Sequence, residues 1–241
     1  MTAQELLRLG RLQEAIAAVT AQVRDRPMDY RTRTFLFELL CFAGEWERAR
    51  KQLSVVAQES AEAETGALLL RSAIAADFKR QQVYESGEFG TPPDPCRRSG
   101  TLNGKPFQSI EDADPRVGGR LEVFLAGEHL LLPFDAIGAM RIAPPATLRD
   151  TLWAPAEILA SPSYRDHELG EMLVPALYPH SSGYPRDEVK LGRVTEWDGD
   201  VPFGQRMLLL DGGEDVVPIL EVRELIFASA GQDAEAQAVS G

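Results

Sequence analysis

The feature that most constrains this chain is the placement of its prolines. Of its 16 prolines, only Pro27 lies before residue 90. Proline removes a backbone donor and clashes with the preceding helical turn, so a proline-free segment rich in Ala, Leu, Arg and Glu is free to form helices. Charge divides in the same way: residues 1–80 hold 12 basic and 11 acidic residues, whereas residues 81–241 hold 13 and 26. We therefore predict a helical domain followed by a strand-rich one.

The predicted domain boundaries follow this change in composition. We expect a helical domain over residues 1–87, a linker over 88–105, a strand-rich domain over 106–228 and a disordered tail over 229–241. The fold class is therefore α+β.

A formal net charge of −12 argues against a nucleic-acid binder or a binder of anionic membranes, and the start of the chain lacks a secretory signal. We expect a cytoplasmic protein.

Helix-capping residues divide the first domain. Thr2 followed by Glu5 predicts a capping box, and Asp29 and Ser60 predict two further helix N-termini. Apolar residues recur with helical periodicity between these signals. We expect five helices, over residues 2–10, 11–26, 29–44, 45–58 and 60–84.

Two glycines between these helices, Gly10 and Gly44, lie 34 residues apart. Each begins the pattern Gly-x-(large apolar)-x-x-Ala, which resembles the second helix of a tetratricopeptide repeat. Repeats of this class bind peptides or helices in a groove. An unrelated helical bundle with a coincidental spacing is the alternative.

The second half contains a repeat of another kind. Residues 122–142 and 207–227 superpose without a gap when Pro133 is aligned with Pro218. Each segment reads as a hairpin, a proline at the strand end and a short helical turn. We predict an antiparallel, partly closed, barrel-like sheet built from such units. Two further strands are expected to end at Trp153 and Trp197, with both indole rings in the core.

Candidate catalytic residues are few. The nucleophile elbow, the phosphate-binding loop and the dinucleotide fingerprint are absent, and the two cysteines and three histidines show no metal-ligand spacing. We expect no metal and no cofactor. Asp112 and Asp114 form the one conceivable carboxylate pair for acid–base chemistry, beside Arg149. An aspartate turn neutralised by Arg116 or Arg120 is the alternative, and we favour it.

Several motifs of the acidic half, taken in order, resemble one known family. They include Leu148–Trp153 (LRDTLW), Val174–Pro179 (VPALYP) and Leu191–Arg193 (LGR). The chain resembles the ImpE family, also called TagJ or SciE, which are accessory proteins of bacterial type VI secretion systems. The motif positions are Asp112, Asp114, Arg149, Asp150, Trp153, Pro175, Tyr178, Arg193, Trp197, Arg206 and Glu221.

This resemblance implies a cytoplasmic, non-enzymatic protein. It implies as partners the small subunit of the contractile sheath, through that subunit's N-terminal helix, and the AAA+ ATPase that recycles the sheath. Two other hypotheses remain: a tetratricopeptide adaptor unrelated to secretion, and an enzyme of unknown class that uses the acidic half.

Arginines on the third and fourth predicted helices are candidate contacts for such a partner. Arg31, Arg33, Arg48 and Arg50 are expected near the concave side of the repeat, with Phe37 facing the groove. A partner helix would bury its apolar face there and place its carboxylates against the arginines. The alternative is that the arginines pair with neighbouring side chains and stay solvated.

Overall fold

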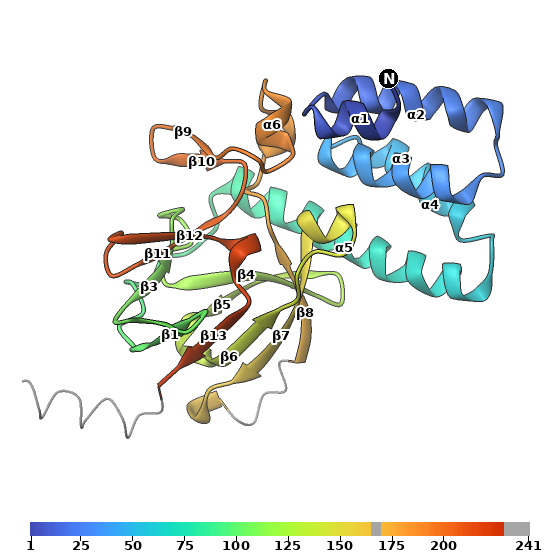
Figure 1. Cartoon of the computed structure of the whole chain (residues 1–241). Helices are drawn as coiled ribbons and strands as arrows, with labels where there is room; N and C mark the ends of the chain where they lie inside the picture. Colours follow the sequence, from blue (N-terminus) through green and yellow to red (C-terminus); the bar gives the residue numbers. More distant parts are fainter. Residues whose placement is uncertain (165–169, 229–241) are drawn as a thin grey trace, which may run out of the picture.

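A computed structural model describes residues 1–164 and 170–228 of the chain (Figure 1). An N-terminal helical region packs beside an antiparallel β-rich region, which confirms the α+β fold class. The predicted disordered tail, residues 229–241, lies outside the described residues.

Five helices form the first region, and their caps are the predicted ones. Thr2 makes a capping box with Glu5, and the side chains of Asp29 and Ser60 accept hydrogen bonds from the first turns of their helices. The helices are α1 (Ala3–Arg8), α2 (Leu12–Asp25), α3 (Tyr30–Phe42), α4 (Trp46–Val56) and α5 (Ala61–Ser86).

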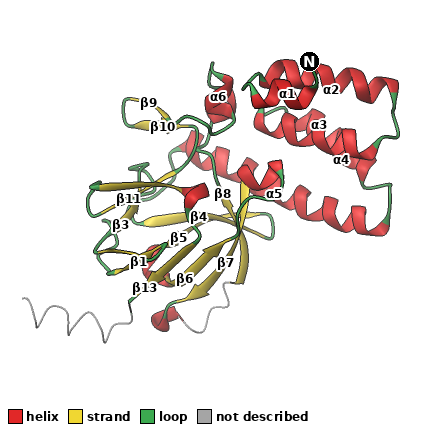
Figure 2. Cartoon of the chain, in the orientation of Figure 1, coloured by secondary structure: helices red, strands yellow, loops and turns green. Residues whose placement is uncertain are grey.

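The two repeat glycines occupy equivalent positions. Gly10 and Gly44 follow α1 and α3 with φ of +76° and +69°, and Ala15 and Ala49 on the next helices are fully buried. The register of the two copies is therefore real. A tetratricopeptide array is not established, however, because α5 is 26 residues long and continues across the sheet instead of forming a third copy. Figure 2 shows α5 passing over the β-rich region.

The main sheet has eight strands in the order β2-β1-β13-β6-β7-β8-β4-β5. A three-stranded sheet, β12-β11-β3, and the β9–β10 hairpin complete the region. The strands are β1 (Gly100–Leu102), β2 (Lys105–Phe107), β3 (Ile110–Asp112), β4 (Arg120–Leu125), β5 (Glu128–Pro133), β6 (Ile137–Ile142), β7 (Trp153–Ala160), β8 (Gly170–Pro175), β9 (Glu196–Asp198), β10 (Val201–Phe203), β11 (Met207–Leu210), β12 (Asp215–Pro218) and β13 (Glu224–Phe227).

Two predictions about this region are corrected. The sheet is not closed into a barrel, since the edge strands β2 and β5 do not pair with each other in the described part of the chain. The expected linker over 88–105 is shorter, because β1 begins at Gly100 and pairs with β13. This pairing draws the segment after α5 into the main sheet.

The predicted proline-centred repeat is correct from the two prolines onward, through the 3-10 helix and the strand that follows. Pro133 and Pro218 have nearly identical φ and ψ, −58° and 136° against −60° and 135°, and each precedes a short 3-10 helix. The strands that follow, β6 and β13, pair antiparallel with Met140 opposite Leu225, so these two strands are related by a local two-fold. The gapless alignment fails in the first strands, because β4 and β5 join by a two-residue turn and β11 and β12 by a four-residue turn.

The helical and β-rich regions share a hydrophobic core. The cluster formed by the helices also contains Phe124, Trp153 and Leu177 from the β-rich region. A second cluster fills the space between the main sheet and the three-stranded sheet. The helical region is therefore packed against the sheet over part of its core, and its boundary at residue 87 is not a gap in packing.

Gly44 provides a test of this packing. A Cβ on Gly44 would lie 2.6 Å from the Oγ of Ser182 in the β-rich region, whereas a Cβ on Gly87 meets nothing within 4 Å. Both glycines have positive φ, so each Ala variant loses about 1 kcal/mol from backbone strain. We expect Gly44→Ala to cost roughly 1 kcal/mol or more beyond Gly87→Ala in urea unfolding, because Ser182 must also move. Equal costs would contradict a tight contact between the two regions.

Candidate functional site

A cluster of charged side chains lies buried between α5 and the sheet. Glu122 of β4 and Arg206, just before β11, are both fully buried, and Arg80 of α5 is 3% exposed. The Arg80 Nη2 and the Glu122 Oε2 are 2.9 Å apart, and Arg206 forms ion pairs with both Glu122 and Asp112. His129 Nε2 lies 2.7 Å from the second oxygen of Glu122.

Main-chain oxygens complete this cluster. Arg206 Nε donates to the carbonyl of Pro175 at 3.2 Å, and Arg80 Nη2 donates to the carbonyl of Leu177 at 2.7 Å. The Arg206 guanidinium also stacks over the ring of Tyr178, 5.1 Å from its centroid. We call Arg80, Asp112, Glu122, His129 and Arg206 the buried charge cluster.

The two carboxylates of the cluster differ in their pKa. Burial opposes ionisation of Glu122, but Arg206, Arg80 and His129 together hold its pKa well below the usual range. Burial dominates for Asp112 and raises its pKa to about 6, although Arg206 acts in the opposite direction. All five side chains are sealed from solvent, so the arrangement fixes the fold and offers a substrate no access.

Four of the family-motif positions thus lie in or against one cluster: Asp112, Pro175, Tyr178 and Arg206. Sequence reasoning missed Arg80, Glu122 and His129. A glutamate inside the apolar strand Leu121–Leu125 is the signal that could have revealed the cluster, since a carboxylate at such a position needs a buried partner.

The aspartate turn is confirmed. The Asp112 Oδ1 accepts from the Asp114 amide at 2.8 Å, and Asp114 binds the Arg116 guanidinium at 2.7 Å. Arg149 is not part of this group. It lies on the 3-10 helix 148–151 beside Asp150, which caps that helix, so the hypothetical enzyme site does not assemble.

The remaining motif positions are structural or exposed. Arg193 donates to the carbonyls of Leu7 and Arg8, which joins α1 to the β-rich region, and Glu221 is exposed. Trp153 is buried as expected, but it begins β7 instead of ending a strand. Trp197 lies in the short β9 and is 48% exposed, so its prediction as a core residue was wrong.

The predicted arginine surface is only partly available. Arg33 donates hydrogen bonds to the Pro27 carbonyl and to the Gln52 side chain. Arg48 and Arg50 form ion pairs with glutamates three residues before them. Arg31 is exposed. Phe37 is 1% exposed, which contradicts its predicted place in an open groove, because both faces of α3 are covered.

An open groove lies elsewhere, between α5 and the sheet. It has a volume of about 500 Å³ and is mostly apolar. We call it the α5–sheet groove and define it by Leu69, Ser72, Ala73, Phe124, Leu125, Ala126, Gly127, Arg141, Ala143, Pro155, Ala156, Glu157, Glu171, Met172 and Leu173. Neither composition nor helical periodicity revealed it, because its floor and wall come from five separate segments of the chain.

Metal-ligand groups and membrane-spanning helices are absent from the described ranges. No group of three or more His, Cys, Asp or Glu side chains in residues 1–164 and 170–228 could hold a metal ion. None of the helices within those ranges is long and apolar enough to cross a membrane.

Two comparisons with known proteins show a family, and a third shows the fold. The family described as "ImpE protein" matches residues 104–226. The type VI secretion system accessory component TagJ of Pseudomonas aeruginosa is 31% identical, over 94% of this chain and 91% of its own. The crystal structure of protein VPA1032 from Vibrio parahaemolyticus has a TM-score of 0.79 at 24% identity, covering 94% of this chain and 97% of its own, and so shares the fold.

Glu122→Gln tests the buried charge cluster. The substitution keeps the side-chain shape but leaves Arg80 and Arg206 without their shared anion, and breaking such a buried pair costs about 3–5 kcal/mol. The free energy of unfolding, measured with urea, should fall most at neutral pH and less in acid. The reason is that a carboxylate with a depressed pKa stabilises the fold only while it is ionised. Glu128→Gln, at an exposed pair with Lys79, is the control and should cost about 0.5 kcal/mol or less.

Glu38→Gln should stabilise the protein at neutral pH, in contrast to Glu122→Gln, which should destabilise it. Burial raises the pKa of Glu38 on α3 to about 7, with Arg149 lowering it and Asp150 raising it. The folded state therefore binds a proton more tightly than the unfolded chain, and wild-type stability falls as pH rises from about 4.5 to 7. The Gln variant should gain stability over wild type across this interval and hold the gain at pH 8. A constant difference between pH 5 and 8 would contradict the shift.

Proposed function

The chain belongs to the ImpE family, and we propose on this premise that it acts as a binding component of a type VI secretion system. Its relative TagJ is an accessory component of such a system. The proposed role is to hold other proteins of the apparatus, in the cytoplasm, without catalysis of its own.

The α5–sheet groove is the observation that carries this proposal. An open, mostly apolar groove of about 500 Å³ suits the apolar face of a partner segment. The carboxylates of Asp112 and Glu122, in contrast, are sealed inside the protein in ion pairs with arginine, and Asp150 caps a 3-10 helix. Binding therefore explains the arrangement of side chains better than acid–base catalysis.

The proposed partners are the small subunit of the contractile sheath, bound through its N-terminal helix, and the AAA+ ATPase that recycles the sheath. A helix is the kind of ligand that an apolar groove accommodates, since its apolar side chains recur on one face. The arginine surface of α3 and α4 is a second candidate contact, now limited to Arg31, Arg48 and Arg50, because Phe37 is buried.

The test uses the purified chain together with the purified sheath small subunit and sheath-recycling ATPase of a type VI secretion system from the same organism. Calorimetry should detect binding to the sheath small subunit, to the ATPase, or to both, and deletion of the sheath subunit's N-terminal helix should abolish the first interaction. The triple variant Arg31→Ala/Arg48→Ala/Arg50→Ala separates the two candidate surfaces, since it should leave affinity within about twofold if the groove is used. Failure of wild type to bind either protein would overturn the proposed partners.

A further inference from the structure

The α5–sheet groove has a floor formed by the outer face of the sheet. Pro155 of β7 is paired with Leu173 of β8, and Leu173 is paired with Phe124 of β4, so these three residues form an apolar row across neighbouring strands. Ala143, which follows the end of β6, lines the same groove. This part of the sheet is left open because α5 lies over β4 and β5, where Arg80 and Lys79 pair with Glu122 and Glu128.

The wall of the groove is the N-terminal half of α5. Leu69, Ser72 and Ala73 recur at helical spacing on the side that faces the groove, and the β4–β5 turn closes one end. Leu69 is 68% exposed and Leu125 is 36% exposed. Apolar side chains gathered in a concavity and left in water mark a surface that a partner covers.

The backbone of the floor restricts the conformation of that partner. Strand β7 is hydrogen-bonded to β6 and β8, and β8 is hydrogen-bonded to β7 and β4. The pairing of β8 with β4 is limited to Leu173 and Phe124, but the apolar row runs across the strands, so a segment that follows this row crosses the strand direction and cannot add as a further strand. A segment buried in this groove has to satisfy its own backbone groups, and a helix does so.

A charged row lies directly beside the apolar row. In register across the sheet, Glu224 of β13 faces Arg141 of β6, Arg141 faces Glu157 of β7, and Glu157 faces Glu171 of β8. Arg141 forms its ion pair with Glu224, at 3.2 Å. Over residues 1–164 and 170–228, no ion pair is formed by Glu157 or Glu171.

Two like charges directly opposite each other on neighbouring strands are unfavourable. Both Glu157 and Glu171 line the groove, so a cation carried by its occupant would relieve their repulsion. From this juxtaposition, we propose that the α5–sheet groove binds an amphipathic helix whose apolar ridge is flanked on one side by Lys or Arg. The ridge lies along the apolar row and the basic flank lies over Glu157 and Glu171.

The geometry sets the length of the contact. The apolar row on β7, β8 and β4, extended by Ala143 after β6, spans three inter-strand spacings, or about 14 Å. A helix covers this distance in about ten residues, and it presents three or four apolar side chains to the floor at positions i, i+3, i+4 and i+7. This inference rests on the proposed function only in that the groove binds a protein segment, and it adds the charge that selects the segment.

Two synthetic helices serve as probes for the full-length protein. Both are 16-residue peptides with Leu at i, i+3, i+4 and i+7; one carries three Lys on a single flank and its twin carries three Glu there. In fluorescence anisotropy the basic peptide should bind at least about tenfold more tightly than the acidic twin, since two ion pairs are gained in one complex and two repulsions in the other. Raised salt should narrow this ratio.

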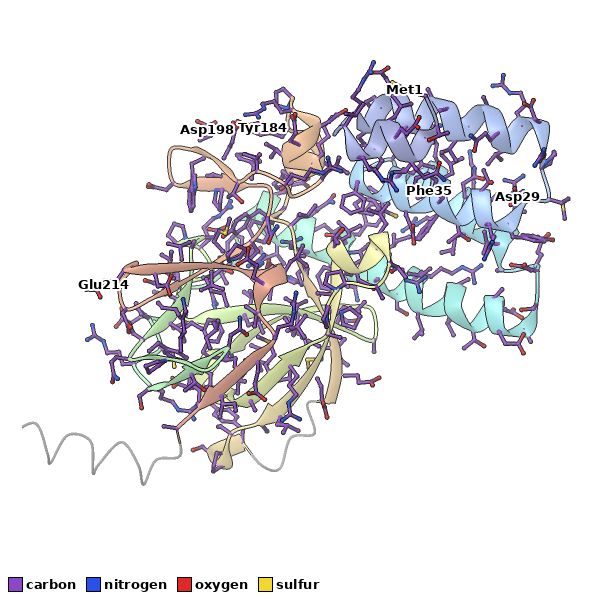
Figure 3. The ribbon with its side chains drawn as sticks, viewed as in Figure 1. Met1, Asp29, Phe35, Tyr184, Asp198 and Glu214 are labelled. Carbon is purple, nitrogen blue, oxygen red and sulfur yellow. The ribbon has the colours of Figure 1, made fainter. Side chains whose placement is uncertain are left out.

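Charge variants locate the recognition. Glu157→Lys/Glu171→Lys should reverse the preference, and the isosteric Glu157→Gln/Glu171→Gln should reduce it to about twofold or less. The control Glu88→Lys/Glu214→Lys makes the same change in net charge at two exposed sites and should keep the wild-type preference. Figure 3 shows Glu214 at the far end of the β-rich region from the helices.

A pair of leucines tests the wall. Leu69 lines the groove, whereas its neighbour Leu68 is 60% exposed and does not. Leu69→Ser should weaken the basic peptide about fivefold or more, and Leu68→Ser should leave its affinity unchanged. Melting temperatures of all variants should stay near wild type, because each substituted side chain is exposed.

The outcomes separate this inference from the proposed function. If the two peptides bind equally well, or if Glu157→Lys/Glu171→Lys keeps the wild-type preference, the basic-helix proposal is wrong, whatever the secretion proteins do. If the peptides behave as expected while wild type binds neither the sheath subunit nor the ATPase, the groove proposal is supported and the proposed partners are wrong. If a secretion partner does bind, its affinity should drop with Leu69→Ser and not with Leu68→Ser.

Discussion

The carboxylate of Glu122, held between the guanidinium groups of Arg80 and Arg206, is the interaction on which the rest of the structure depends. A buried charge is costly unless every partner is in place, so the cluster tolerates only one position of α5 on the sheet. Through Arg206 it also fixes Asp112 on β3 and the carbonyl of Pro175 at the end of β8. One side chain thus aligns a helix with both sheets, and the wall of the α5–sheet groove is placed as a consequence.

The features predicted correctly from the sequence are those with local causes. Helix caps at Thr2, Asp29 and Ser60 depend on contacts three residues away, and the conformation after Pro133 and Pro218 depends on the proline itself. The arginine–carboxylate pairs of the charge cluster join residues 42 to 94 positions apart, as in the pairs of Glu122 with Arg80 and Asp112 with Arg206. No local pattern encodes such a pairing, so motif positions were recognised without their roles.

The errors have equally specific causes. Phe37 is predicted in a groove because helical periodicity shows which residues share a face, but not whether that face is covered. In α3, both faces are covered. The barrel was expected because alternation indicates half-buried strands, but closure depends on whether the edge strands meet. The repeat alignment failed by two residues because turn lengths of two and four are compatible with the same flanking strands.

The acidic residues of the second half act in two ways in this geometry. The excess of acidic residues after residue 80 produces a field that attracts basic segments at a distance, but such a field has no preferred contact and is screened within about 10 Å at 0.1 M salt. Glu157 and Glu171, held side by side by the register of β7 and β8, give that attraction a fixed place and direction. The apolar row beside them supplies the part of the binding energy that salt does not weaken. A frame with sealed internal charge and two exposed glutamates in an apolar groove is therefore suited to hold a basic helix.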